Sequence, residues 1–373
     1  STMACVTEAL GMMLPGGAAI PAVHSDRLRN ASESGAAAVS MVENGGPRPS
    51  EIITPASLSN AFRVLLAIGG STNGVIHLAA LAGRLGIEID YSALDRLGRE
   101  TPVLVDLKPS GSHYMEDLQK AGGLAPLLRE LAPLLDFDCL TVTGRSLGEE
   151  LDAAAPPWPQ GVVRPRDKPL HAEGGIAVLG GNLAPGGAII KHSAATPALL
   201  SFEGRAVVFD SLDDMAVRID DPALDVTAED VLVLRNAGPI GAPGMPEAGY
   251  IPIPKKLAAA GVKDMLRISD ARMSGTAFGA IVLHLCPEAA IGGPLALVQN
   301  GDRIRLDVPA RRLDVLVSDE EMETRRKAWT PPAPHPGAER GWLALHLAHV
   351  QQADKGCDLD VLVGKPSGAR APA

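Results

Sequence analysis

The sequence predicts an α/β protein of two domains, an N-terminal helical α/β domain followed by a β-barrel-like domain with helices. The chain has 373 residues, which is long for a single hydrophobic core. Its first half carries mainly helical periodicity, whereas the second half has short β-rich runs between glycine, proline and asparagine turns. Residues 153–161 are proline-dense and aperiodic, which is typical of a linker. We therefore expect domains at 1–160 and 161–330, and a linker with a C-terminal helix or tail at 331–373.

Helices dominate the expectation for the first domain. Residues 3–14, 26–43 and 57–67 each have a helical pattern with glycine, proline or hydroxyl residues at one end. A glycine turn at 69–74 precedes a further helix, and an interrupted helix is expected at 115–135. Residues 102–107 predict a short buried strand, and 141–150 predict a strand, a turn and a helix.

Short strands dominate the expectation for the second domain. They are expected at residues 176–179, 188–191, 204–209, 231–235, 302–308 and 312–317. Many short strands at modest spacing indicate a barrel or a sandwich. Helices are expected at 211–218, 254–260 and 341–352, and the last residues, 367–373, are expected to fray.

Composition and charge exclude several classes of function. A net charge of −10 argues against a nucleic-acid groove, which needs a basic stripe, but not against a small anionic substrate. No apolar run approaches the roughly 20 residues of a membrane span, and no secretory signal pattern opens the chain. The four cysteines are far apart and form no Cys-x-x-Cys pair, as expected of a cytoplasmic protein with free thiols.

The segment of residues 267–279, which contains Met273-Ser274-Gly275, is the strongest candidate for a site. It places a serine where a strand is expected to end and a helix to begin, and Gly275 leaves room for a ligand beside the hydroxyl. The alternative is a strand-to-helix turn in which Ser274 only caps the helix.

Two further stretches could bind an anion. The turn with Ser71-Thr72-Asn73 precedes a helix, so its free N–H groups could hold a carboxylate, although a turn with a helix cap is the better explanation of this pattern by itself. Lys191 ends a predicted strand and could present a cation to an anionic substrate, with a structural role as the alternative. The pair His284 and Cys286 is better explained by core packing than by metal binding.

Two motifs resemble one enzyme family. Arg272-Met273-Ser274-Gly275-Thr276, and the segment 242–247 (Ala-Pro-Gly-Met-Pro-Glu), are similar in sequence and order to motifs of the dihydroxy-acid/sugar-acid dehydratases. The turn at 69–73 is also similar to a segment of that family. The resemblance implies a β-barrel C-terminal domain and an active site between the two domains.

The resemblance also implies a reaction. Ser274, as an alkoxide, would remove the C2 proton of a 2,3-dihydroxy acid, and Thr276 would bind the substrate or hold Ser274. Glu247 would bind Mg²⁺, a Lewis-acidic iron of a [2Fe-2S] cluster would take the C3 hydroxyl, and a 2-keto-3-deoxy acid would result. Residues expected to bind substrate are Ser71, Thr72, Asn73, Lys191 and Arg272.

Details of the serine motif and of the C-terminal tail favour the sugar-acid branch. Asp270-Ala271-Arg272-Met273-Ser274 and the tail at Cys357-Asp358 indicate a C5 or C6 aldonate such as arabinonate or xylonate, and the branched-chain dihydroxyacid dehydratase is the alternative. Family membership further implies a homodimer or homotetramer.

The start of the chain resembles the end of the family's third cysteine segment. The chain then corresponds to about the C-terminal two-thirds of a family member, with a partial N-terminal domain. None of Cys5, Cys139, Cys286 and Cys357 matches a cluster position, so no cluster ligand is expected in this chain. A truncated, non-catalytic paralogue that binds a sugar acid therefore stays an alternative, as does an unrelated α/β ligand-binding protein in which Ser274 is only a cap.

Overall fold

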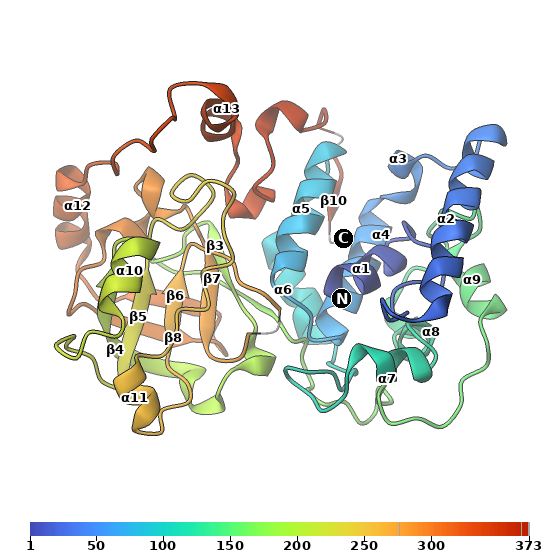
Figure 1. Cartoon of the computed structure of the whole chain (residues 1–373), viewed down its shortest axis with the longest axis horizontal. Helices are drawn as coiled ribbons and strands as arrows, with labels where there is room; N and C mark the ends of the chain where they lie inside the picture. The colour runs from blue at the N-terminus through green and yellow to red at the C-terminus, as the bar shows by residue number, and fades with distance from the viewer. Residues whose placement is uncertain (276, 367, 372–373) are drawn as a thin grey trace. The chain divides into compact units, whose positions relative to one another are not determined.

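A computed structural model describes residues 1–275, 277–366 and 368–371. The chain forms two compact units: unit 1 is Ser1–Gly175 with the C-terminal stretch from Gly364, and unit 2 is Ile176–Val363. Unit 1 is mainly helical, and unit 2 is built on a large sheet (Figure 1). The predicted α/β class, with a helical first part and a barrel-like second part, is confirmed. No helix in the described part of the chain is long and apolar enough to cross a membrane.

Unit 1 combines helices with one short parallel strand pair, β1 with β10. Its elements are α1 (Thr2–Ala9), α2 (Ser25–Glu43), α3 (Pro49–Ile52), α4 (Pro55–Ala67), α5 (Asn73–Arg84), β1 (Glu88–Ile89), α6 (Tyr91–Glu100), α7 (Met115–Lys120), α8 (Ala125–Glu130), a 3₁₀ turn (Ala132–Leu134), α9 (Leu147–Ala153) and β10 (Arg370–Ala371).

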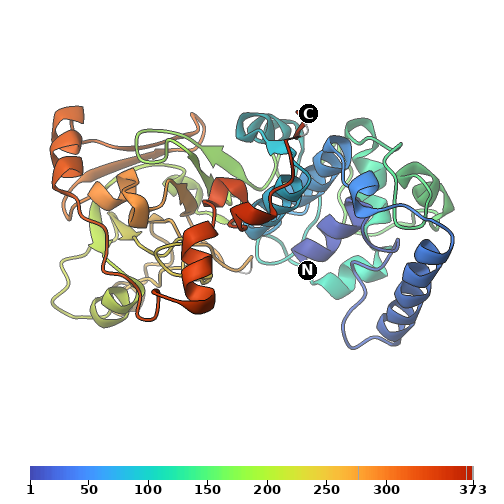
Figure 2. The same ribbon diagram turned by 90° about the horizontal axis from the view of Figure 1, so that it is seen from above.

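Helix α4 is the central helix of unit 1, and ten of its 13 residues are buried. It begins with a reciprocal cap, because the backbone N–H groups of Thr54 and Ser57 each donate to the other residue's hydroxyl. Helix α1 packs against it. Helix α2 differs, since none of its residues is buried, and Figure 2 shows it along the outer side of unit 1.

Unit 2 contains an eight-stranded sheet with the order β2-β3-β7-β6-β5-β4-β8-β9. The central strands β4, β5, β6 and β7 pair in parallel, and the flanking pairs are antiparallel. The strands are β2 (Ala177–Leu179), β3 (Gly187–Ile190), β4 (Ser201–Phe209), β5 (Asp230–Leu234), β6 (Arg267–Ser269), β7 (Ile281–Cys286), β8 (Arg303–Asp307) and β9 (Arg312–Val315).

The two edges of this sheet meet, so the sheet nearly closes into a barrel. Gly180, directly after β2, pairs with Arg312 of β9; the N–H of Gly180 donates to Arg311 O, and the N–H of Leu313 donates to Gly180 O. Closure places one set of alternating strand residues in a shared core, which includes Ile190, Val208, Val233, Ile268 and Ile304.

Helices of unit 2 lie outside the barrel or follow it in sequence. A second apolar cluster, with Phe209, Leu232 and Leu234, packs against residues of α10 and α11 on the other face of the sheet. The helices are α10 (Leu212–Arg218), α11 (Lys255–Ala259), α12 (Asp319–Ala328) and α13 (Gly341–His349), with 3₁₀ turns at His192–Ala194, Pro197–Leu199, Ala289–Ile291, Pro294–Leu297, Ala353–Lys355 and Asp360–Leu362.

Several local expectations were wrong. The strand expected at the start of residues 141–150 is only an isolated bridge between Leu140 and Ser146. The first helix ends at Ala9, because Gly11 has a φ of +84° and leaves the helical region. Residues 102–107 make only isolated bridges, through Val103, Val105 and Leu107. Among the described residues between β6 and β7, no helix follows Ser274.

Candidate active site

Ser274 lies in an irregular segment between two central parallel strands, β6 and β7. The segment leaves β6 at Asp270 and Ala271, and Ser274 is exposed. Since no helix follows among the described residues, the hypothesis that Ser274 caps a helix loses its basis. Thr276, the second predicted catalytic residue, lies outside the described residues.

A buried ion pair anchors this segment. The Arg267 Nη2 and Asp264 Oδ1 atoms lie 2.7 Å apart, and both side chains are almost fully buried. Arg267 also donates to Phe278 O, while the Asp264 carboxylate accepts the N–H groups of Ala280 and Thr196. These charge-assisted bonds attach the end of the segment nearest to β7, and also the stretch after β3, to the same ion pair.

Lys191 brings a buried cation to the segment. It follows β3, is 2% exposed, and its Nζ lies 3.5 Å from Gly275 O. Burial lowers the pKa of the Lys191 ammonium to about 8. No carboxylate of the described residues lies within ion-pair distance of this amine. A buried ammonium without an acid partner can stabilise an anion that enters beside it.

Arg272 connects the serine segment to the second motif. Its Nε donates to Met245 O at 2.5 Å, and its own carbonyl oxygen accepts the N–H of Gly249 at 2.8 Å. Glu247 lies between these two contacts and is exposed. The structure therefore brings Lys191, Arg272, Ser274 and the stretch with Glu247 together within unit 2.

Ser71 and Thr72 lie in the turn before α5 in unit 1, as predicted, and Asn73 is the first residue of the helix. The Ser71 hydroxyl accepts the N–H of Asn73, and the Ser71 N–H donates to Thr2 Oγ1. The hydroxyl of Thr72 is buried without a hydrogen-bond partner among the described residues. Such a group is costly to leave unpaired, so it is a candidate contact for a ligand.

Two buried carboxylates near the segment were not predicted. Asp270 is fully buried, burial raises its pKa to about 7, and its two oxygens accept the N–H groups of Ala237 and Ala289. Glu288 is 1% exposed and has a raised pKa for the same reason. Asp270 stood in the serine motif and directly after a predicted strand, but neither signal assigned it a role in the site.

The described residues do not supply a complete site for either group that the family resemblance implies. No set of three or more His, Cys, Asp or Glu side chains among them converges on a point where a metal ion could bind. Burial raises the pKa of each of the four cysteine thiols to about 12, so none is a ready thiolate. Glu247 offers a single carboxylate, and Mg²⁺ needs more oxygen ligands than that.

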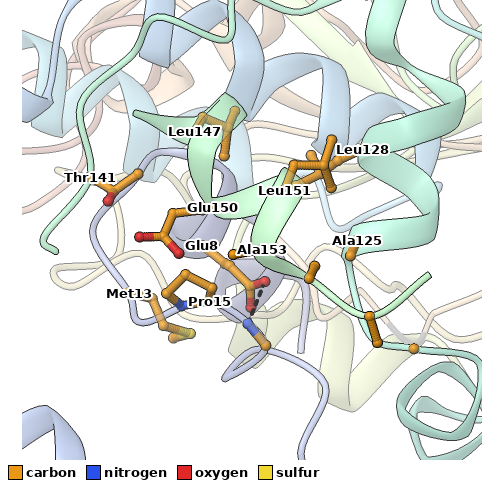
Figure 3. Close-up of a pocket in the computed structure, with 14 residues that line it drawn as sticks. Glu8, Met13, Pro15, Ala125, Leu128, Thr141, Leu147, Glu150, Leu151 and Ala153 are labelled. Carbon is orange, nitrogen blue, oxygen red and sulfur yellow. Dashed lines mark hydrogen bonds between the residues drawn. The ribbon is translucent and has the colours of Figure 1, made fainter. Parts of the chain in front are cut away.

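A cavity of about 350 Å³ in unit 1 contains no predicted site residue. Its wall is mostly apolar, with side chains such as Met13, Leu128 and Leu151, and the carboxylates of Glu8 and Glu150 face it (Figure 3). Glu8 is engaged structurally, because its oxygens accept the N–H groups of Gly16 and Ala18. This cavity and the candidate chemistry therefore involve different residues.

Comparison with known proteins identifies one family. Residues 1–150 match the profile of the dihydroxy-acid/6-phosphogluconate dehydratase N-terminal region, and residues 161–357 match that of the C-terminal region. Similar proteins include an L-arabonate dehydratase of Azospirillum brasilense (51% identity, 99% of this chain and 64% of the relative). Others are an L-arabinonate dehydratase of Rhizobium leguminosarum (50%, 96% and 61%) and a 6-deoxy-6-sulfo-D-gluconate dehydratase of Pseudomonas putida (48%, 97% and 62%). The chain thus spans 61–64% of the length of these relatives.

Proposed function

The chain belongs to the dihydroxy-acid/6-phosphogluconate dehydratase family, and we propose that it serves the dehydration of a sugar acid, a C5 or C6 aldonate, to a 2-keto-3-deoxy acid. Relatives at 48–51% identity carry names of sugar-acid dehydratases, which supports this substrate class. The observation that carries the proposal is the 3.5 Å contact between the Lys191 amine and Gly275 O, because it puts a buried cation beside the serine of the motif.

In the proposed reaction Ser274 is the base. A serine hydroxyl is a weak acid, so it can take a C2 proton only when nearby positive charge stabilises its alkoxide. Lys191, as a buried ammonium, supplies such charge. The Arg272 guanidinium is oriented through Nε, and in this proposal its outer N–H groups bind the carboxylate of the substrate.

After the C2 proton moves to Ser274 Oγ, loss of the C3 hydroxyl completes the elimination, and the enol product tautomerises to the 2-keto acid. We assign the departure of the C3 hydroxyl to no described residue. Thr276 and Glu247 keep their predicted roles, contact with substrate or Ser274 and one oxygen ligand for Mg²⁺, as part of the proposal. Ser71, Thr72 and Asn73 stay proposed substrate contacts, supported by the unpaired Thr72 hydroxyl.

The test is an activity assay on the polypeptide purified from its native source. L-Arabinonate and D-xylonate are compared with 2,3-dihydroxyisovalerate, and the 2-keto product is measured as its semicarbazone. We expect Ser274→Ala to lower kcat for the aldonate by more than about 100-fold, the lower range for loss of a general base. Because the Ser274 side chain is exposed, the unfolding midpoint of the Ser274→Ala variant should equal that of the unsubstituted protein.

The matched control is Ser201→Ala, an exposed serine at the start of β4, which should retain full activity. Turnover of only the branched-chain substrate would favour the alternative, a branched-chain dihydroxyacid dehydratase. Aldonate binding without turnover would favour a sugar-acid-binding paralogue. Loss of stability but not of turnover in Ser274→Ala would refute the catalytic role.

We also propose a cytoplasmic location and a homodimeric or homotetrameric state. The four free cysteines support a reducing compartment. The exposed apolar side chains of Leu28, Val39 and Val42 on α2 support self-association, which light scattering on the purified protein can measure.

A further inference from the structure

The loop of residues 238–247, which ends at Glu247, donates backbone hydrogen bonds to a buried carboxylate. Both oxygens of Glu288 lie 3.1 Å from the N of Ile240, whose N–H they share, and one of them accepts the N–H of Gly241 at 2.9 Å. A Cβ at Gly238 would lie 2.6 Å from Glu288 Oε2, so the close approach of backbone and carboxylate leaves no room for a side chain at this position. The position of the loop therefore depends on the position of this carboxylate.

Gln352, from the stretch after α13, fixes the carboxylate. Its Nε2 donates to Glu288 Oε1 at 2.7 Å, and its Oε1 accepts the Glu288 backbone N–H at 2.9 Å. Both ends of the amide are used, so the pair has one favoured orientation. The partners are 64 residues apart in sequence, and the contact ties the C-terminal segment of unit 2 to the 238–247 loop.

The loop in turn positions Arg272. Met245, near its end, is buried at a φ of +47° and accepts the Arg272 Nε–H through its carbonyl oxygen. The Cys357 thiol donates to Met245 Sδ at 3.3 Å, so the C-terminal segment contacts the same residue a second time. A displaced loop would therefore carry the acceptor away from Arg272.

We propose that Gln352 is a positioning residue for the substrate-binding guanidinium. Through Glu288 it sets the 238–247 loop, and through Met245 O the loop sets the direction of the Arg272 side chain. This inference rests on the proposed function for its kinetic consequence, because it assigns the carboxylate of the substrate to Arg272.

The test compares Gln352→Glu with the exchanged pair Glu288→Gln/Gln352→Glu. The single variant places two carboxylates face to face and removes the donor between them. The exchanged pair again matches a donor with an acceptor between residues 288 and 352. The new amide at 288 accepts the N–H groups of the loop through its single oxygen and donates to residue 352, whose carboxylate accepts the N–H of residue 288. Gln351→Ala is the matched control, since the neighbouring glutamine contributes its backbone N–H to Asp358 O.

We expect Gln352→Glu to raise KM for the aldonate about tenfold with kcat changed less than about twofold, and the exchanged pair to restore KM. Amide hydrogen exchange at Ile240 and Gly241 should accelerate about tenfold in the single variant only. A general folding defect would behave differently, because it lowers apparent kcat through the active fraction and leaves KM unchanged. His335 and His346 still contact the loop backbone at Ile240 and Pro239, so the loop should stay folded.

An unchanged KM in Gln352→Glu, or no recovery in the exchanged pair, would overturn the proposal. If the unsubstituted protein turns over no aldonate, the proposed function fails instead. The exchange measurement is independent of turnover, and equal exchange at Ile240 and Gly241 in all variants would still refute the link from Gln352 to the loop.

Discussion

The proposed role of Lys191 and its buried environment favour opposite charge states of its amine. Its proposed role requires the charged form, because only an ammonium stabilises the Ser274 alkoxide. Its environment favours the neutral form, because burial removes the amine from water and lowers its pKa from 10.5 to about 8. An unfavourable buried charge that persists near a motif serine is typical of a functional site rather than of a structural lysine.

Activity and stability should therefore change in opposite directions as the pH rises. Between about pH 8 and 10.5 the unfolded chain keeps the Lys191 proton and the folded protein releases it, so the free energy of unfolding rises with pH in this window. Compared with Lys191→Met, the unsubstituted protein should gain up to about 3 kcal/mol over the window. Over the same range kcat/KM for the aldonate should fall above about pH 8, because the ammonium is lost.

Urea unfolding and initial rates measured from pH 6.5 to 10 test both directions. Lys255→Met, at an exposed lysine of unit 2, is the control and should follow the unsubstituted protein in both assays. Parallel slopes for all three proteins would mean that Lys191 does not titrate in this range. A kcat/KM that is constant across pH 8 would remove the ammonium from the proposed mechanism.

The sequence alone was sufficient to identify some residues of this site, but not the burial and long-range contacts that surround them. Ser274, Arg272 and Glu247 stand in two motifs, so resemblance was enough to select them. Gln352 and Glu288 carry no local pattern, since their pairing joins segments that meet only in the folded barrel. The burial of Lys191 was also not predictable, because a lysine at the end of a strand is usually solvated.

At the scale of elements, β-propensity and turn residues were sufficient to predict most strands of the sheet. Elsewhere the prediction was limited by close approaches of the backbone to residues distant in sequence. Strand β5 was displaced by a single residue from its predicted position, and β4 begins at Ser201 rather than at residue 204. The expected helix after Ser274 failed because Gly279 has a φ of +124° and packs on Arg267, where a Cβ would lie 1.8 Å from Nη2. Such an approach depends on a partner 12 residues away, which a local pattern does not contain.

Barrel closure depends on a similar approach at the two ends of the sheet. A Cβ at Gly181, whose φ is +143°, would lie 2.0 Å from Leu313 O. The neighbouring Gly180 has nothing within 4 Å of its Cβ direction, although its backbone makes the closing bonds. We expect Gly181→Ala to lower the free energy of unfolding by about 2–3 kcal/mol and Gly180→Ala to change it by less than about 0.5 kcal/mol.

Equilibrium urea unfolding of both variants measures this difference. The pair is well matched because the same methyl group is added at adjacent positions in the same connection. If Gly180→Ala proved as destabilising as Gly181→Ala, loss of glycine flexibility rather than closure geometry would be the cause. Equal stability of all three proteins would mean that the contact between β2 and β9 contributes little to the barrel.

For the whole molecule, the positions of the four thiols bear on whether this chain alone can do more than bind a ligand. Cys5 and Cys139 belong to unit 1, and Cys286 and Cys357 belong to unit 2. The described partners of three thiols are protein groups: Asn60 Nδ2 donates to Cys139 Sγ, and Cys286 and Cys357 donate to Asp354 and Met245. These cysteines satisfy local packing and hydrogen bonding, and they do not form a donor set for a cluster.

We therefore expect the 373 residues, expressed alone and incubated with iron and sulfide, to retain less than one cluster per chain after desalting. Their thiols, with pKa values of about 12, should react slowly with a disulfide reagent at pH 7 and rapidly once unfolded in urea. Aldonate should still bind, and Lys191→Met should weaken that binding, because the cation lies beside Gly275 O within unit 2. A stoichiometric visible spectrum that is lost in Cys→Ser variants would show that these thiols are cluster ligands. Aldonate affinity unchanged by Lys191→Met would show that the buried cation does not receive the substrate.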